Sequence, residues 1–298
     1  MQPTDTAPKL SHFKRGKLLT KGAWATLRAD KELVMLPFIS AIAGLIIIGS
    51  YFALTFTITQ HGNTHILAGG NIFAYILMYV LLSVMGHFFE GALFAGATER
   101  FNGGDPTVKS SLAAAKRRIK PLLVFSLFMG TIGLILNTIE QRVPLAGRIA
   151  IWLVNASWSV ANIFAIPVIM STQDDISPLE ATRESVKIIK KVWGENVIAQ
   201  FSIGLVALFA FLGVVVFGGV VGGLSTALFG DSAGLFIAAP LIILLFIAVI
   251  LVFSTLNTII KAAVYHYAVT GTSPEQFSAE LLRQTMTVKK SRKLFLGK

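Results

Sequence analysis

The chain lacks cysteine and is poor in charge. No cysteine occurs among its 298 residues, which excludes disulfide bonds, thiolate nucleophiles and thiolate metal ligands. Charged residues make up only 14% of the chain, whereas a soluble domain carries about a quarter. Hydrophobic residues make up 54%, and the mean hydropathy is +0.71. The composition therefore predicts a membrane protein that crosses the bilayer several times.

Long stretches without a charged residue define the predicted spans. They cover residues 33–89, 121–139, 149–173, 196–230 and 232–260. A helix needs about 20 apolar residues to cross a bilayer, so the first stretch holds two helices around the polar turn TQHGNTH and each other stretch holds one. The fold class is thus all-α and polytopic. Six transmembrane helices are predicted near residues 34–58, 71–98, 120–140, 149–172, 196–229 and 234–269.

Lysine and arginine gather on one side of these spans. Of 26 such residues, 24 lie near the termini or in the loops after spans 2 and 4, and only Arg142 and Arg148 lie elsewhere. The positive-inside rule then places both termini in the cytoplasm. The net charge of +11 becomes a cytoplasmic rim that can meet anionic lipid headgroups. Because the basic residues flank spans, we expect no nucleic-acid partner.

Three segments begin alike, one after every second span. They are GGDPTVKSSLAAAKRRI from 103, DISPLEATRESVKIIKKVW from 175 and GTSPEQFSAELLRQTMTVKK from 271. In each, a polar residue precedes a proline: Asp105–Pro106, Ser177–Pro178 and Ser273–Pro274. This pair is typical of a helix N-cap and first helical residue, and Ser177 with Glu180 or Ser273 with Gln276 fits a capping box. The repeat predicts three helical hairpins with amphipathic interfacial helices between them.

The same pattern predicts the domain organisation. Residues 1–32 form a cytoplasmic amphipathic segment, residues 33–272 form the transmembrane domain, and residues 273–298 form a basic cytoplasmic helix and tail. No cleavable signal peptide is expected, since the first apolar run starts only at Leu33. Spans 5 and 6 each exceed 30 residues, so they must tilt, break or project beyond the membrane. Pro240 is the candidate break.

Five polar side chains inside the spans form a candidate site: Glu90, His87, Asn162, Asn257 and Lys261. Glu90, Asn162 and Asn257 each lie 16 or 17 residues before a repeat proline, at a predicted depth of about 13 Å. A carboxylate there costs several kcal/mol unless it is neutral, paired or hydrated. We therefore expect Glu90 to face the protein interior and to meet Lys261 or Asn162. Two interpretations stay open: a polar layer that lines a substrate or ion path, and interhelical hydrogen bonds.

Four glycines of span 5 follow the small-xxx-small pattern: Gly218, Gly219, Gly222 and Gly223. The pattern allows close helix packing within one subunit, and a hinge or a contact within a homo-oligomer is the alternative. His87, Glu90 and His266 are too few to predict a metal site. We expect no metal and no cofactor.

Four stretches carry a resemblance to a known family: WATLRADKELVMLPFIS, ERFNGGDPTVKSSLAAA, SPLEATRESVKIIKKVWGENVIAQFSIG and LNTIIKAAVYHYAVTGTSPEQFS. Together they resemble an uncharacterised family of bacterial six-span integral membrane proteins. The resemblance implies a bacterial cytoplasmic membrane location, and it implies no activity. More loosely, LEATRESVKIIKKVWG is similar to the membrane domain found beside glycerophosphodiester phosphodiesterases.

No enzyme motif accompanies these features. The chain has no P-loop, dinucleotide fingerprint, HExxH helix or GxSxG elbow. A channel or transporter for ions or small solutes is the first hypothesis. A non-catalytic oligomeric scaffold that engages anionic lipid is close behind it. An intramembrane lipid-active enzyme comes third, because no nucleophile or metal set is evident.

Overall fold

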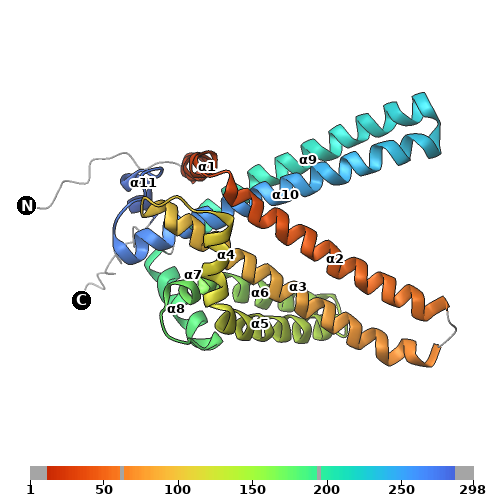
Figure 1. Ribbon diagram of the computed structural model, residues 1–298, viewed down its shortest axis with the longest axis horizontal. Helices are drawn as coiled ribbons and strands as arrows, with labels where there is room; N and C mark the ends of the chain where they lie inside the picture. Colours follow the sequence, from red (N-terminus) through yellow and green to blue (C-terminus); the bar gives the residue numbers. More distant parts are fainter. Residues whose placement is uncertain (1–11, 61–63, 193–195, 286–298) are drawn as a thin grey trace, which may run out of the picture. The chain divides into compact units, whose positions relative to one another are not determined.

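The computed structural model describes residues 12–60, 64–192 and 196–285, so parts of both predicted terminal segments lie outside the described residues. The described chain is helical and contains no strand (Figure 1). The helices are α1 His12–Ala29, α2 Glu32–Gln60, α3 Thr64–Phe101, α4 Val108–Arg117, α5 Ile119–Glu140, α6 Leu145–Ala161, α7 Ala165–Ser171, α8 Pro178–Val192, α9 Asn196–Phe229, α10 Asp231–Thr270 and α11 Ala279–Thr285.

Among the described residues, six helical segments are long and apolar enough to cross a membrane, which confirms the predicted number of spans. They are Glu32–Phe56, Ile72–Phe101, Ile119–Glu140, Leu145–Ser171, Ala210–Phe229 and Ser232–Thr270. Large apolar side chains point outward along them. Phe73 is 70% exposed and Phe236 is 82% exposed. Such exposure suits lipid tails, which are as apolar as these side chains.

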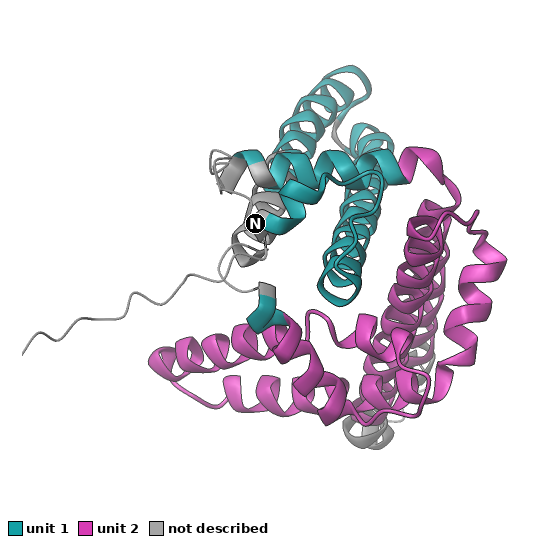
Figure 2. Ribbon diagram, turned by 90° about the vertical axis from the view of Figure 1, so that its left-hand side faces the viewer, with its two compact units in different colours: residues 1–26, 189–298 teal, residues 27–188 magenta. Residues whose placement is uncertain are grey.

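The chain divides into two compact units (Figure 2). We call residues 1–26 and 189–298 the terminal unit, and residues 27–188 the central unit. In the terminal unit, α9 and α10 pack side by side along their length. In the central unit, α3 contacts α2, α4, α5 and α7. The helix that carries His87 and Glu90 therefore contacts most of the other helices of the central unit.

Two glycines make the turn between α9 and α10. Gly230 has a φ of +81°, a conformation that other residues rarely adopt. The N–H of Gly234 donates to the carbonyl of Gly230 over 2.8 Å. A Cβ on Gly234 would overlap main-chain atoms of Ser225 and Thr226, so the two helices meet as closely as glycine allows.

Pro240 does not break the last span. α10 runs without interruption from Asp231 to Thr270, so the candidate break is wrong. A proline inside a transmembrane helix removes one main-chain hydrogen bond, which the surrounding structure can tolerate. At about 1.5 Å per residue, α10 reaches about 60 Å, which exceeds the hydrocarbon thickness of about 30 Å.

The interruption lies in span 4 instead. α6 ends at Ala161 and α7 begins at Ala165. Pro167 follows two residues later, has no N–H for the carbonyl of Ile163, and crowds that carbonyl. Asn162 has φ −101° and ψ 7°, which is outside the helical range. One of the five candidate polar residues thus stands at a break in a span.

One predicted N-cap is confirmed. α8 begins at Pro178, directly after Ser177. The main-chain N–H of Ser177 donates to the Glu180 carboxylate over 3.1 Å, and the N–H of Glu180 donates to Ser177 Oγ over 3.3 Å. This is the reciprocal capping box that the sequence predicted.

The other two predicted caps are wrong by two to five residues. α4 begins at Val108, and its N-cap is Thr107, which shares a capping box with Ser110. α11 begins at Ala279, and the hydroxyl of Ser278 accepts from its first turn. Asp105–Pro106 and Ser273–Pro274 instead lie in the irregular segments that precede these helices. A proline suits a turn as well as a first helical residue, and another cap lies just beyond it.

The apolar face of α1 packs inside the terminal unit. Leu19 and Ala23 are fully buried. A Cβ on Gly22 would lie 2.8 Å from the carbonyl oxygen of Gln276 and from the ring of Phe277. α1 and the segment just before α11 therefore pack against each other through a close approach at Gly22.

Candidate functional site

The two units divide the five candidate polar residues. Glu90 and His87 lie on α3 and Asn162 follows α6, all in the central unit, whereas Asn257 and Lys261 lie on α10 in the terminal unit. All five side chains are half-buried. The pairing of Glu90 with Lys261 or Asn162 stays a prediction.

His87 makes a hydrogen bond between α3 and α5. Its Nδ1 lies 3.1 Å from the Oγ of Ser126, and its ring packs edge-on against Phe125, with 5.3 Å between ring centroids. The Ser126 hydroxyl donates its only hydrogen to the carbonyl of Leu122 over 2.7 Å. With that hydrogen on the carbonyl, Oγ accepts from Nδ1 in the His87 tautomer that carries a proton there.

A polar stripe continues from His87 along the α3–α5 interface. Ser83 donates to the main-chain carbonyl of Ser126 over 3.2 Å. A Cβ on Gly133 would come within 2.5 Å of the Tyr79 hydroxyl. Tyr79, Ser83 and His87 recur every fourth residue, so they share one helix face. Sequence analysis missed Tyr79 and Ser83, although their spacing is a visible signal for such an interhelical contact.

The break in span 4 receives its polar partners from α8. The Asn162 amide donates to the carbonyl of Trp158 over 2.9 Å and accepts from the Thr182 hydroxyl over 2.7 Å. The N–H of Phe164 donates to Ser185 Oγ over 3.0 Å, and Ser185 is fully buried. A main-chain group freed in a buried place must find such a partner. The amphipathic helix α8 therefore closes the interruption.

Arg118 binds the end of α7, and sequence analysis counted it only as a flanking charge. Its Nε donates to the Ile169 carbonyl over 3.0 Å, and its two Nη atoms donate to the carbonyls of Gln173 and Asp174 over 2.9 Å and 2.7 Å. The last carbonyls of a helix lack partners and carry partial negative charge. Lys120 adds an ion pair of 2.6 Å with Asp175. Every residue has a main-chain carbonyl, so the sequence does not reveal which carbonyls Arg118 binds.

An acidic cluster joins the ends of α2, α3 and α4. The Nε of Arg100 lies 3.0 Å from Oδ2 of Asp30, without hydrogen-bond geometry, and the Asp30 side chain is only 5% exposed. Glu32 accepts from the N–H of Val108 over 2.8 Å. Burial raises the pKa of Asp30 above its ordinary 3.8; Arg100 opposes this, and Asp105 reinforces it. Among the described residues, no three His, Asp or Glu side chains gather as metal ligands.

The four glycines of span 5 differ in how closely other atoms surround them. A Cβ on Gly218 would come within 3.1 Å of Ile242 on α10, so this glycine serves packing within the subunit. A Cβ on Gly219, Gly222 or Gly223 would meet no described atom within 4 Å. A contact of these three glycines with a second copy of the chain stays a prediction.

Comparison with known proteins identifies a family. Residues 70–275 match the model of a family of unknown function, DUF6159. This match covers more than half of the chain, so the protein belongs to DUF6159. No curated protein matches the chain, and no solved structure matches it. A bacterial source and the likeness to the phosphodiesterase-associated membrane domain stay predictions.

Proposed function

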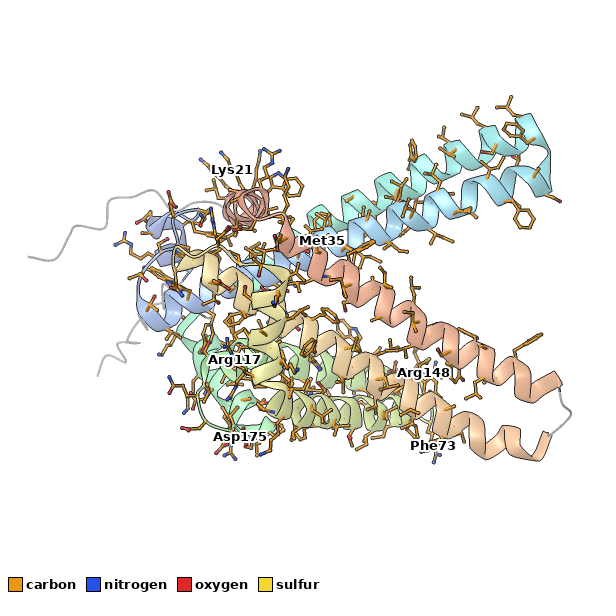
Figure 3. All side chains as sticks on the ribbon, in the orientation of Figure 1. Lys21, Met35, Phe73, Arg117, Arg148 and Asp175 are labelled. Carbon is orange, nitrogen blue, oxygen red and sulfur yellow. The ribbon has the colours of Figure 1, made fainter. Side chains whose placement is uncertain are left out.

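We propose that this DUF6159 member is a non-catalytic scaffold of the bacterial cytoplasmic membrane that gathers anionic phospholipid around its basic helices. In this proposal, six spans form three hairpins, and both termini face the cytoplasm. The charge asymmetry of the loops supports that orientation. Arg117 and Asp175 lie toward one end of the central unit, and Arg148 lies toward the other (Figure 3).

The observation that carries the proposal is the division of three helices into a buried face of mainly small and apolar residues and an exposed basic face. Buried are Leu19 and Ala23 of α1, Ser111 and Ala115 of α4, and Ala181, Ser185 and Ile188 of α8. Exposed are Lys14, Lys17 and Lys21 of α1, Lys109, Lys116 and Arg117 of α4, and Arg183, Lys187, Lys190 and Lys191 of α8.

This division determines how these helices can interact with a membrane. An interfacial helix inserts its apolar face into lipid, but here that face already packs inside the protein. The cations remain outside, and each Lys or Arg near an anionic surface contributes about 1 kcal/mol. The proposal therefore rests on headgroup charge and not on insertion.

The polar contacts inside the spans favour the scaffold over a solute path. His87 is engaged with Ser126, and Asn162 is engaged with Trp158 and Thr182. Such bonds hold helices together. They support the second of the two interpretations that the sequence left open.

Lipid selectivity in proteoliposomes tests the proposal. Spin-labelled phosphatidylglycerol and phosphatidylcholine report how strongly the protein prefers the anionic headgroup. We expect the variant Arg183→Gln/Lys190→Gln/Lys191→Gln to lose several-fold in this preference, because three cations leave the anionic surface. The control Arg142→Gln/Arg148→Gln removes charge from the opposite loop and should keep the preference. Equal losses in both variants, or no preference in the wild type, would contradict the proposal.

A channel or transporter is the second candidate, and the interrupted span 4 favours it. Discontinuous transmembrane helices build the substrate sites of many transporters. Glu90 would then supply the ionisable group of the path. Solute flux separates this candidate from the scaffold.

A further inference from the structure

A cavity of about 500 Å³ lies between α3, α4 and α7 of the central unit. This volume falls in the usual range of small-molecule sites, about 300–1,000 Å³. Two arginines, Arg117 and Arg118, line it, and no aspartate or glutamate does. The lining therefore favours an anionic ligand.

The two arginines that line the cavity differ in their hydrogen bonding. Three of the five N–H donors of Arg118 are taken by one carbonyl in the last turn of α7 and two carbonyls just after it, so this side chain is held in place. Arg117 is exposed and pairs with no residue that the structure describes. A guanidinium fork matches two oxygens of a phosphate. Arg117 is thus the group that a phosphate would meet.

Part of the cavity lining is apolar. Phe94 and Ala95 of α3 and Met170 of α7 line it, and these helices belong to candidate membrane spans. A small water-soluble phosphate gains nothing from such a wall. An amphiphile gains from both sides, because its acyl chain can lie along the spans while its headgroup meets the arginines.

Two hydroxyl groups in the lining further restrict which lipid headgroups the cavity can bind. Thr98 donates its hydrogen to the Phe94 carbonyl, and Thr172 donates its hydrogen to the Val168 carbonyl, each over 2.8 Å. Thr98 and Thr172 both line the cavity, and with those hydrogens engaged a ligand can use their hydroxyl oxygens only as acceptors. They would repel phosphate oxygens and accept from a hydroxyl of the ligand.

We infer that this cavity binds an anionic phospholipid whose phosphodiester meets Arg117 and whose headgroup hydroxyls donate to Thr98 and Thr172. Phosphatidylglycerol has this chemistry. The inference rests on the proposed engagement of anionic lipid, and it goes further by assigning one lipid to one site.

Native mass spectrometry of the full chain in neutral detergent tests the site, with phosphatidylglycerol as the probe. We expect Arg117→Gln to weaken the first bound lipid roughly five- to tenfold, because a charged hydrogen bond is lost. Lys116→Gln is the matched control: it removes the same charge one residue away, outside the cavity lining. It should change binding by roughly twofold or less. Ala114→Phe should block the site by filling the cavity without any change in charge.

The outcomes separate the alternatives. Equal effects of Arg117→Gln and Lys116→Gln, or unchanged binding in Ala114→Phe, would overturn the site. Displacement of the lipid by free glycerol 3-phosphate at the same concentration would overturn the lipid assignment in favour of a soluble anion. If the site fails while the α8 cations still govern lipid selectivity in proteoliposomes, only this inference falls. If the wild type shows no selectivity for anionic lipid, the proposed function falls as well.

Discussion

The hydrogen bond between the Ser126 hydroxyl and His87 Nδ1 is one of those that link α5 to α3 in the central unit. We expect Ser126→Ala to lower the free energy of unfolding by about 0.6 kcal/mol, and by up to about 1.7 kcal/mol, because the bond from His87 is lost. Ser157→Ala is the matched control, since Ser157 also donates to a carbonyl of its own helix and its hydroxyl makes no other hydrogen bond to a described residue. Unfolding in detergent and SDS mixtures measures both. Equal losses of unfolding free energy in the two variants would show that the hydrogen bond between His87 and Ser126 does not stabilise the fold.

Asp30 predicts the sign of a pH dependence of folding stability. Its folded-state pKa is raised by burial, so the folded protein binds this proton more tightly than the unfolded chain does. The stabilisation is complete below the unfolded pKa of about 3.9 and is lost as the pH rises through the raised folded value. We expect the wild type to lose stability relative to Asp30→Asn as the pH rises above about 4.

Thermal unfolding across that pH range measures the difference. A relative gain of stability with rising pH would mean that the attraction of Arg100 outweighs the burial of Asp30. Asp175 provides a contrast of opposite sign, because Lys120 lowers its pKa. It is exposed to solvent, so its effect should be small.

Sequence analysis found polar residues in the spans but not their partners. Glu90, His87 and Asn162 stand out because polar residues are costly in a membrane. Ser126, Thr182 and Ser185 do not stand out, because a hydroxyl can bond to its own helix anywhere in a span. Which of them also faces another helix depends on packing, which one sequence does not reveal.

At the next scale, glycines decide how closely α9 and α10 approach. We expect Gly234→Ala to destabilise the protein by about 1–3 kcal/mol, because the new Cβ overlaps main-chain atoms that cannot move aside. Gly223→Ala meets open space and should be neutral or stabilising by up to about 1 kcal/mol. The midpoint of thermal unfolding compares the two. Destabilisation by Gly223→Ala would instead show that this glycine packs against a second copy of the chain.

The elements themselves could largely be predicted, because spans are set by length and hydrophobicity alone. Their interruptions could not. Pro240 and Pro167 look alike in the sequence, yet α10 continues through the first and span 4 stops before the second. The difference lies in α8, whose Thr182 and Ser185 accommodate the polar groups at the break. Interruption therefore depends on whether a neighbouring element supplies hydrogen bonds.

For the whole molecule, the orientation in the membrane is the first expectation to test. The chain has no cysteine, so a single introduced cysteine reports its own location. We expect Arg142→Cys to react with an impermeant maleimide in intact cells, and Lys187→Cys to react only after permeabilisation. Both positions are exposed. Labelling in the reverse order would invert the proposed orientation and would remove the basic helices from the anionic cytoplasmic leaflet.

The central claim is that the polar side chains within the spans hold helices together and that the protein acts on lipid and not on a solute. Flux of ions and small solutes across proteoliposomes tests it most directly, with wild type, Glu90→Gln and protein-free vesicles side by side. The account predicts no flux above the protein-free level for either protein, in vesicles that still show the preference for anionic lipid. Wild-type flux that falls in Glu90→Gln would contradict it and establish the polar residues as a conduction path.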